Sequence, residues 1–238
     1  MNERQRQLLE AIILVYVKTA EPVSSAQLAT SGKFDLSPAT IRNDMAELEA
    51  AGYITHPHTS SGRIPTEKGY RYFIEHALPE RTLNVRQQRE FEAATEQVDD
   101  ERNFLKAITR MIAAHASNAS FVAFDPRDVY TTGLSYLFAQ PEYSQPDVVQ
   151  RMSQAVDQLD DLLGRLFSQS DQALAILVGS QSPLGRECST MVVRYRTPEH
   201  SGMLGVFGPV RMDYPKNLAL LRYSQELIDN FNRLHDES

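Results

Sequence analysis

The sequence predicts an α+β protein with two domains, the first mainly helical and the second combining helices with antiparallel strands. Two observations predict this class. Residues 3–78 carry apolar residues at helical spacing, separated by capping residues and followed by a short hairpin pattern. From residue 119 onward, helical stretches alternate with short apolar runs, two of which are joined by a turn-rich loop. The 238 residues, 42% hydrophobic and 23% charged, are enough for one or two domains with their own cores.

Three helices are predicted before residue 52. The first covers residues 3–19 and the second residues 25–30. Ser37 caps the third and Pro38 takes its first position, where the missing N–H costs nothing. Gly52 ends it as a left-handed residue. The residues expected to be buried on the first and third helices are Leu9, Ile12, Ile13, Tyr16, Ile41, Met45 and Leu48.

The third helix has a small, polar and cationic face opposite its apolar stripe. At 100° per residue, Ala39, Asn43 and Ala50 lie on that face, and Thr40 and Arg42 flank it. Asn can pair with adenine, Arg with guanine, and a methyl group can contact thymine. The pattern therefore predicts a helix whose first turns enter a DNA major groove.

A hairpin is predicted after this helix, with strands at 53–55 and 63–66 around a tip rich in Ser, Thr and Gly. Helix and hairpin together indicate a winged helix-turn-helix, and Thr66 is expected to cap a fourth helix that ends at Leu78. The alternative is a surface helix with a loop of no special meaning. Hydroxyl groups, backbone N–H groups and cations of the hairpin would bind phosphate. The predicted DNA-binding residues are Ser37, Ala39, Thr40, Arg42, Asn43, His58, Thr59, Ser60, Ser61, Gly62, Arg63, Lys68 and Arg71.

Charge argues mildly against nucleic-acid binding, because the net charge is −7. Residues 1–80 hold 8 Lys and Arg against 10 Asp and Glu, so the N-terminal part is not basic either. The cations gather locally between residues 56 and 72. We therefore expect few phosphate contacts per subunit, and a homodimer for tight binding.

The stretch 79–118 is predicted to hold linker helices, with the domain boundary at 79–82. A helix over 85–97 has a thin apolar face of Phe91, Ala94 and Val98, which makes it a candidate for subunit contacts together with the exposed sides of 146–167. Another helix reaches about Ala116, and its strong stripe favours packing on a sheet. The rest, 119–238, is predicted to contain strands at 120–124, 173–178, 191–195 and 203–207, helices at 146–167 and 214–233, and a strand or turn at 130–138.

The motifs of common enzymes are absent: there is no GxGxxG after a strand, no P-loop and no G-x-S-x-G. We therefore expect no catalytic residue and no cofactor. His56 and His58 lack further ligands at metal spacing, so no metal site is expected. The single Cys188 fits a buried or incidental thiol, and Arg211 and Asp213 either pair structurally or hold a ligand. No 18-residue apolar run and no signal peptide is found, which favours the cytoplasm.

Four segments resemble one known family. LSPATIRNDMAELEAAGYITHPHTSSGRIPTEKGYRYF, GLSYLFAQPEY, VGSQSPLGREC and LGVFGPVRMDY are similar, in this order, to the HrcA family of heat-inducible transcription repressors. The resemblance is weak over 80–118. The chain also departs from the family in length, since members are about half as long again and the missing part lies in the middle.

The resemblance implies a winged helix-turn-helix over 1–78 and a reduced GAF-like regulatory and dimerisation domain over 119–238. It also implies a sequence-specific, nucleoid-associated repressor of heat-shock (chaperone) genes that binds double-stranded DNA at an inverted-repeat operator. A homodimer and a GroEL-type chaperonin are the implied partners. The family's insertion that carries dimer contacts has no counterpart in this sequence.

Two other functions stay open from the sequence. A small-molecule-sensing regulator would bind a metabolite in its GAF-like domain, and a protein-interaction module would no longer read DNA. A polar pocket within 119–238 would favour the sensor, whereas a filled apolar interior would favour the repressor.

Overall fold

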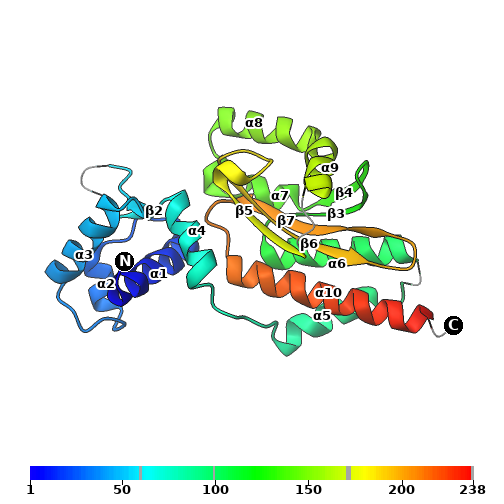
Figure 1. The fold of residues 1–238 in the computed structure, drawn as a ribbon, viewed down its shortest axis with the longest axis horizontal. Helices are drawn as coiled ribbons and strands as arrows, with labels where there is room; N and C mark the ends of the chain where they lie inside the picture. Colours follow the sequence, from blue (N-terminus) through cyan, green and yellow to red (C-terminus); the bar gives the residue numbers. More distant parts are fainter. Residues whose placement is uncertain (59–60, 99, 170–172, 237–238) are drawn as a thin grey trace. The chain divides into compact units, whose positions relative to one another are not determined.

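The computed structural model describes residues 1–58, 61–98, 100–169 and 173–236 (Figure 1). The chain divides into two compact units, Met1–Pro79 and Glu80–Ser238. The helices predicted as linkers within 79–118 belong to the second unit. None of the described helices is long and apolar enough to cross a membrane.

The first unit contains four helices and a short hairpin, as predicted. Ser24, Ser37 and Thr66 each cap a helix by accepting a backbone N–H, which satisfies donors that the first helical turn leaves free. Gly52 has φ +76°, the left-handed conformation expected after a helix end. The elements are α1 (Glu3–Thr19), α2 (Ser25–Thr30), α3 (Pro38–Ala50), β1 (Ile54–Thr55), β2 (Ile64–Pro65) and α4 (Glu67–His76), so the last helix ends two residues before the predicted Leu78.

The hairpin is bound to the helical core by a third piece of extended chain. The Val23 N–H donates to the Arg63 carbonyl at 2.9 Å, and the Arg63 N–H donates to the Val23 carbonyl at 2.8 Å. The backbones approach so closely at Gly62 that a Cβ there would lie 2.5 Å from the Val23 oxygen. Glycine is therefore required at position 62 for packing.

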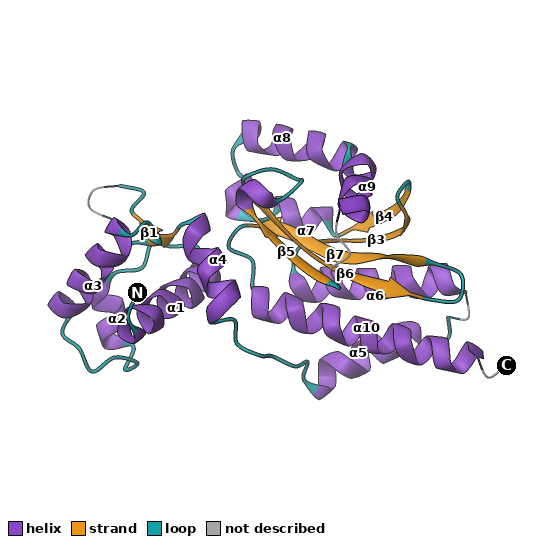
Figure 2. Cartoon of the chain, in the orientation of Figure 1, coloured by secondary structure: helices purple, strands orange, loops and turns teal. Residues whose placement is uncertain are grey.

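The second unit is built on one antiparallel sheet of five strands in the order β4-β3-β7-β6-β5 (Figure 2). The two longest strands, β6 and β7, form the predicted hairpin, joined by a loop that is shorter than predicted because both strands extend beyond their apolar segments. The α+β class is confirmed. The strands are β3 (Ala119–Asp125), β4 (Asp128–Thr132), β5 (Leu174–Val178), β6 (Cys188–Arg196) and β7 (Ser201–Pro209).

Helices cover both faces of this sheet (Figure 1). One face packs against α6 (Glu101–Ala116) and α10 (Tyr214–Asp236). The other packs against α7 (Leu134–Phe138), η1 (Pro141–Tyr143), α8 (Pro146–Asp157) and α9 (Leu159–Gln169), around fully buried Phe121 and Phe207.

The apolar side of α5 (Val85–Thr95) is covered within its own unit. Phe91 is fully buried, stacked on His115 of α6 and edge-on to Tyr223 of α10. The Phe91 part of this apolar face is therefore already occupied and is not available for the subunit contact predicted for it.

Three local predictions differ from the structure. The single helix predicted for 146–167 is two helices that break at Gln158, which buries both Met152 and Leu163 against the sheet. The ambiguous stretch 130–138 contains both a strand and a helix, divided by Gly133 with φ +79°. On α1, Tyr16, which was predicted to be buried, is only half-buried.

Candidate nucleic-acid interface

The helix predicted to read DNA, α3, is fixed to α1 by its buried side. Ile41 and Leu48 are almost completely buried, as predicted. Asp44 lies between them and is also buried, 3% exposed, and it accepts a hydrogen bond from Arg4 Nη2 at 2.8 Å. A second bond joins Gln5 of α1 to Glu47 of α3 at 2.5 Å. These contacts fix the rotation of α3 about its axis and thus decide which residues face solvent.

The outward face of α3 contains the residues predicted for base contact. Ala39, Arg42 and Asn43 are exposed, and no side-chain hydrogen bond or ion pair of Arg42 or Asn43 is found among the described residues. Thr40 is half-buried, and its hydroxyl lies 2.9 Å from that of Ser37. Arg42 and Asn43 are therefore free to hydrogen-bond with base edges, while Ser37 and Thr40 are held at the start of the helix.

Glu49, near the end of α3, joins that helix to the hairpin. Its carboxylate accepts a hydrogen bond from Arg63 at 2.8 Å and contacts the His56 ring. Partial burial by itself would raise the pKa of Glu49, but the hydrogen bonds and charges of His56 and Arg63 hold it below its usual value. Glu49 is therefore ionised at neutral pH and holds the hairpin against α3.

The other cations predicted to bind phosphate also have partners within the first unit. Lys68 donates to the Ala51 carbonyl at 2.7 Å and lies 4.4 Å from the centre of the Tyr53 ring. Arg71 pairs with Glu67. Lys68 and Arg71 thus stabilise the ends of α3 and α4, and each can offer DNA only its remaining N–H groups.

The tip of the hairpin is closed by its own residues. The Ser61 hydroxyl donates to the His58 carbonyl at 2.6 Å and accepts from the His58 N–H at 3.1 Å. The His58 side chain is exposed. Thr59 and Ser60 lie outside the described residues.

Sequence reasoning missed the residues that position this surface. Glu49 and Arg63 are 14 residues apart, and Arg4 and Asp44 are 40 residues apart. A charged residue inside an apolar stripe, as at Asp44, is the one signal that could have indicated a buried carboxylate with a distant partner.

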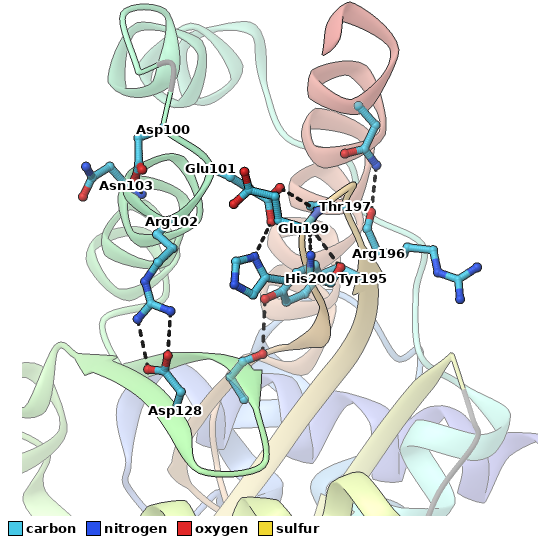
Figure 3. Close-up of polar contacts among 12 residues, drawn as sticks. Asp100, Glu101, Arg102, Asn103, Asp128, Tyr195, Arg196, Thr197, Glu199 and His200 are labelled. Atoms are coloured by element: carbon cyan, nitrogen blue, oxygen red, sulfur yellow. Dashed lines mark hydrogen bonds and ion pairs between the residues drawn. The ribbon is translucent and has the colours of Figure 1, made fainter. Parts of the chain in front are cut away.

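The second unit contains one group of potential metal ligands among the described residues: Glu101, Glu199 and His200 (Figure 3). The oxygens of Glu101 accept hydrogen bonds from the His200 ring at 2.7 Å, the Glu199 N–H at 3.3 Å and the Thr197 hydroxyl. These bonds use the oxygens that a metal would need, and the positive N-terminal end of α6 disfavours a cation. The group therefore fastens the start of α6 to the β6–β7 loop.

A second pair fastens α6 to β4. Arg102 makes two hydrogen bonds to Asp128, at 2.6 Å and 3.0 Å (Figure 3). Its guanidinium also lies over the Phe124 ring. The hydrogen bond from Arg102 holds the pKa of Asp128 below its usual value, which is expected for a carboxylate paired with a guanidinium.

The remaining candidate ligand residues have structural partners. Arg211 pairs with Glu142 and donates to Gln140 at 2.9 Å, and Asp213 pairs with Arg81 at 3.1 Å. These contacts support the structural alternative for both residues. Cys188 is completely buried, and burial raises the pKa of its thiol to about 12, which makes it unreactive at neutral pH.

Comparison with known families matches both units. Residues 1–78 match the model of the winged helix-turn-helix transcription repressor, HrcA DNA-binding, and residues 66–218 match the model of the HrcA protein C terminal domain. A heat-inducible transcription repressor HrcA from Roseiflexus sp. (strain RS-1) is 24% identical over 357 residues, covering 100% of this chain and 99% of the relative. The corresponding repressor from Carboxydothermus hydrogenoformans is 26% identical over 341 residues, covering 98% of this chain and 99% of the relative.

The alignments also confirm the predicted difference in length. The alignment with the Roseiflexus protein spans 357 positions against the 238 residues of this chain, and 357 minus 238 leaves 119 positions without a counterpart. A shorter alignment with the HrcA repressor of Natranaerobius thermophilus is 53% identical over 88 residues, covering 37% of this chain and 25% of that protein. Among solved structures, one titled as the crystal structure of a hypothetical protein has a TM-score of 0.77 and 18% identity, covering 97% of this chain and 98% of the other, which supports the fold.

Proposed function

Because the chain belongs to the HrcA family of transcription repressors, we propose that it represses heat-shock (chaperone) genes by binding an inverted-repeat DNA operator. One observation carries the proposal: Arg42 and Asn43 are exposed on the first turns of α3, with no side-chain partner among the described residues. A helix positioned by an ion pair to its buried Asp44, with free Arg and Asn side chains on its first turns, suits major-groove readout. The relatives compared above are named heat-inducible repressors, which supports the same regulated response.

The proposal includes a homodimer in the cytoplasm, associated with the nucleoid, and a GroEL-type chaperonin as a second partner. Charge supports the dimer. Arg63, Lys68 and Arg71 are all engaged within the first unit, so each protomer has few cations free for phosphate. Two protomers on two half-sites would bind far more tightly than one, since the second contact becomes intramolecular.

Footprinting on the chaperone promoters of the source organism tests the proposal. We expect two protected half-sites related by a two-fold axis, with their centres about one helical turn or a multiple of it apart. Protection that is equal on promoter and scrambled duplexes would contradict sequence-specific repression.

The packing of the described residues in the second unit disfavours the alternative function, a small-molecule sensor. The space between the sheet and α7–α9 is filled by apolar side chains, including fully buried Phe121 and Phe207. A polar groove between β6 and α10 is open to solvent and is lined by residues of both signs, among them Arg194, Arg222 and Asp229. A filled interior favours the repressor. A metabolite that changes operator affinity in a binding titration would reverse this preference.

Replacing Glu49 with Gln should weaken binding to all duplexes alike, by about 1 kcal/mol or roughly fivefold. The substitution removes the charge that holds Arg63 and His56, so the hairpin loses its fixed position against α3. Fluorescence anisotropy titrations on operator and scrambled duplexes would measure the effect. Glu75→Gln, on exposed α4 surface, removes one negative charge without touching the hairpin and is the matched control. A less negative charge by itself favours DNA binding. An affinity that rises equally in both variants would therefore contradict the role of Glu49 in holding the hairpin against α3.

Replacing Arg63 with Ala should also weaken binding to all DNA sequences alike. The salt dependence of binding shows whether the lost affinity comes from a phosphate contact of Arg63. If Arg63 contacts a phosphate through its remaining N–H groups, the slope of log K against log salt falls by about 0.9. We expect this smaller slope. An unchanged slope with reduced affinity would mean that Arg63 acts only through Glu49 and contributes no phosphate contact.

A further inference from the structure

The outer edge of β5 has no strand partner in the part of the second unit that the structure describes. Strand β5 is the last in the order β4-β3-β7-β6-β5, and among the described residues it pairs only with β6. Its sequence, LAILV, contains no charged residue and no proline. We propose that this edge binds the same edge of a second copy of the chain, so that two sheets join into one across a two-fold axis. The inference rests on the proposed function, which requires a homodimer, and it identifies the surface through which the two copies bind.

The register of β5 with β6 shows which backbone groups face outward. Arg194 N–H donates to the Ala173 carbonyl, and the pairing continues with Leu174 opposite Val193. In an antiparallel pair, hydrogen-bonded and non-bonded residues alternate. The N–H and C=O groups of Leu174, Ile176 and Val178 therefore point away from β6. The Val178 carbonyl also caps the short 3-10 helix η2 (Gly179–Gln181), where it accepts the first hydrogen bond of that helix.

Other surfaces of the second unit suit a second copy less well. The apolar side of α5 is buried against α6 and α10. The exposed residues of α8 and α9 are polar and largely acidic, including Asp147, Asp157 and Asp161, and two such faces would repel each other. Among the described side chains of this unit, Val85 and Tyr136 are the large apolar ones that remain exposed, so no apolar patch is available.

The opposite edge of the sheet has features that disfavour pairing. Strand β4 carries Asp128, which is held by Arg102, and a bulge lies between Ala123 and Asp125 where it pairs with β3. Charged residues and bulges are the usual means of blocking a strand edge. Strand β5 has neither. Because β5 carries no charged side chain, two copies of a chain of net charge −7 can meet there with little electrostatic repulsion between the strands.

The outward groups of β5 are self-complementary. If Ile176 of one copy lies opposite Ile176 of the other, Leu174 lies opposite Val178 in both directions. Every outward N–H then faces an outward C=O, because all three residues have the same orientation in the strand. A two-fold axis through Ile176 therefore pairs these groups in both directions, with the Val178 carbonyl accepting a second hydrogen bond beside the one it accepts within η2.

Disulfide trapping in the full-length chain tests this register. Opposed residues in a bonded antiparallel pair have Cα atoms about 5.5 Å apart, within the range of a disulfide. Ile176→Cys should therefore give a covalent dimer on mild oxidation. Leu174→Cys is the matched control, since its two copies would lie roughly 13 Å apart along the strands. The double variant Leu174→Cys, Val178→Cys should cross-link again. The native Cys188 is completely buried and should stay reduced.

Sedimentation of Ile176→Pro is the second measurement. The N–H that proline removes points away from β6, so the strand keeps its bonds within the protomer. We expect dimer dissociation to be at least tenfold easier, whereas Ile176→Val should behave as the parent protein. Circular dichroism would check folding, and the cysteine set decides the question if the proline variant does not fold.

The outcomes separate this inference from the proposed function. A dimer that binds operator but cross-links equally at 174 and 176, or that survives Ile176→Pro in a folded protein, overturns the β5 interface and leaves the repressor intact. Cross-linking confined to 176 and to the 174/178 pair, without any operator preference, supports the interface and contradicts the repressor.

Discussion

Alanine at Asn43 or at Arg42 is expected to lower affinity for the proposed operator by about 1–3 kcal/mol per half-site and to relax the base preference at the contacted position. The reason is geometric. Both side chains are exposed on the first turns of α3, while Asp44 and Ile41 beside them are buried and fix that face outward. Each can form a bidentate pair with one base, Asn with adenine and Arg with guanine. Binding curves on operator and scrambled duplexes measure the loss as a change in the ratio of the two affinities.

Matched controls exist in the second unit. Asn103→Ala on α6 and Arg127→Ala between β3 and β4 remove the same chemical groups from exposed positions away from α3. Both should leave the affinity ratio unchanged. If Asn43→Ala also leaves that ratio unchanged, α3 is not the reading helix, even if overall DNA binding persists.

The outward face of α3 could be predicted from the sequence because its causes are local. Ser37, Pro38 and Gly52 mark the helix ends, and the spacing of Ile41, Met45 and Leu48 fixes the buried side. Once the ends and the buried side of a helix are known, its exposed face follows from 100° per residue. The exposed Arg42 and Asn43 agree with this derivation.

The arrangement of the hairpin could not be predicted in the same way. The cations Arg63, Lys68 and Arg71 were expected to face phosphate, yet each pairs within the first unit, and Gly62 is required by the approach of Val23. Those partners are set by tertiary packing, which periodicity and capping do not encode. The break at Gln158 has a similar origin, because it has no proline or glycine to mark it and serves the packing of Met152 and Leu163 on the sheet.

On warming, the second unit should open before the first, and operator affinity should fall with it. The sheet depends on pairing between segments distant in sequence, such as Ala119 of β3 with Phe207 of β7, and β5 is bonded on one side only within the protomer. Such contacts stabilise the fold only after long loops have closed, and closing those loops costs conformational entropy. The helices of the first unit form through hydrogen bonds between residues close in sequence, and Ser24, Ser37 and Thr66 cap three of them. A strand edge that opens readily also exposes the unit to aggregation.

Hydrogen exchange at increasing temperature tests the order of opening. Protection within 173–209 should fall before protection in 8–17 and 41–48, and operator affinity should follow the former. If the second unit supports the dimer, its opening converts bivalent binding into two weak contacts and the gain from linkage is lost. A chaperonin that refolds this unit would restore binding, and unfolded proteins competing for that chaperonin during stress would delay it. Simultaneous loss of protection in both units, or earlier loss in the first, would contradict this mechanism.

A substitution at Asn217 offers an independent test of the same mechanism. This residue of α10 is completely buried, and neither atom of its amide has a hydrogen-bond partner among the described residues. A buried polar group without a partner costs about 1–3 kcal/mol, and an apolar side chain of similar shape removes that cost. Asn217→Leu should therefore raise the unfolding midpoint of the second unit by roughly 2–4 °C per kcal/mol gained. Operator release should move to higher temperature by the same amount, while the first unit melts unchanged. A stabilised second unit whose operator release stays at the original temperature would show that the heat response originates elsewhere in the molecule.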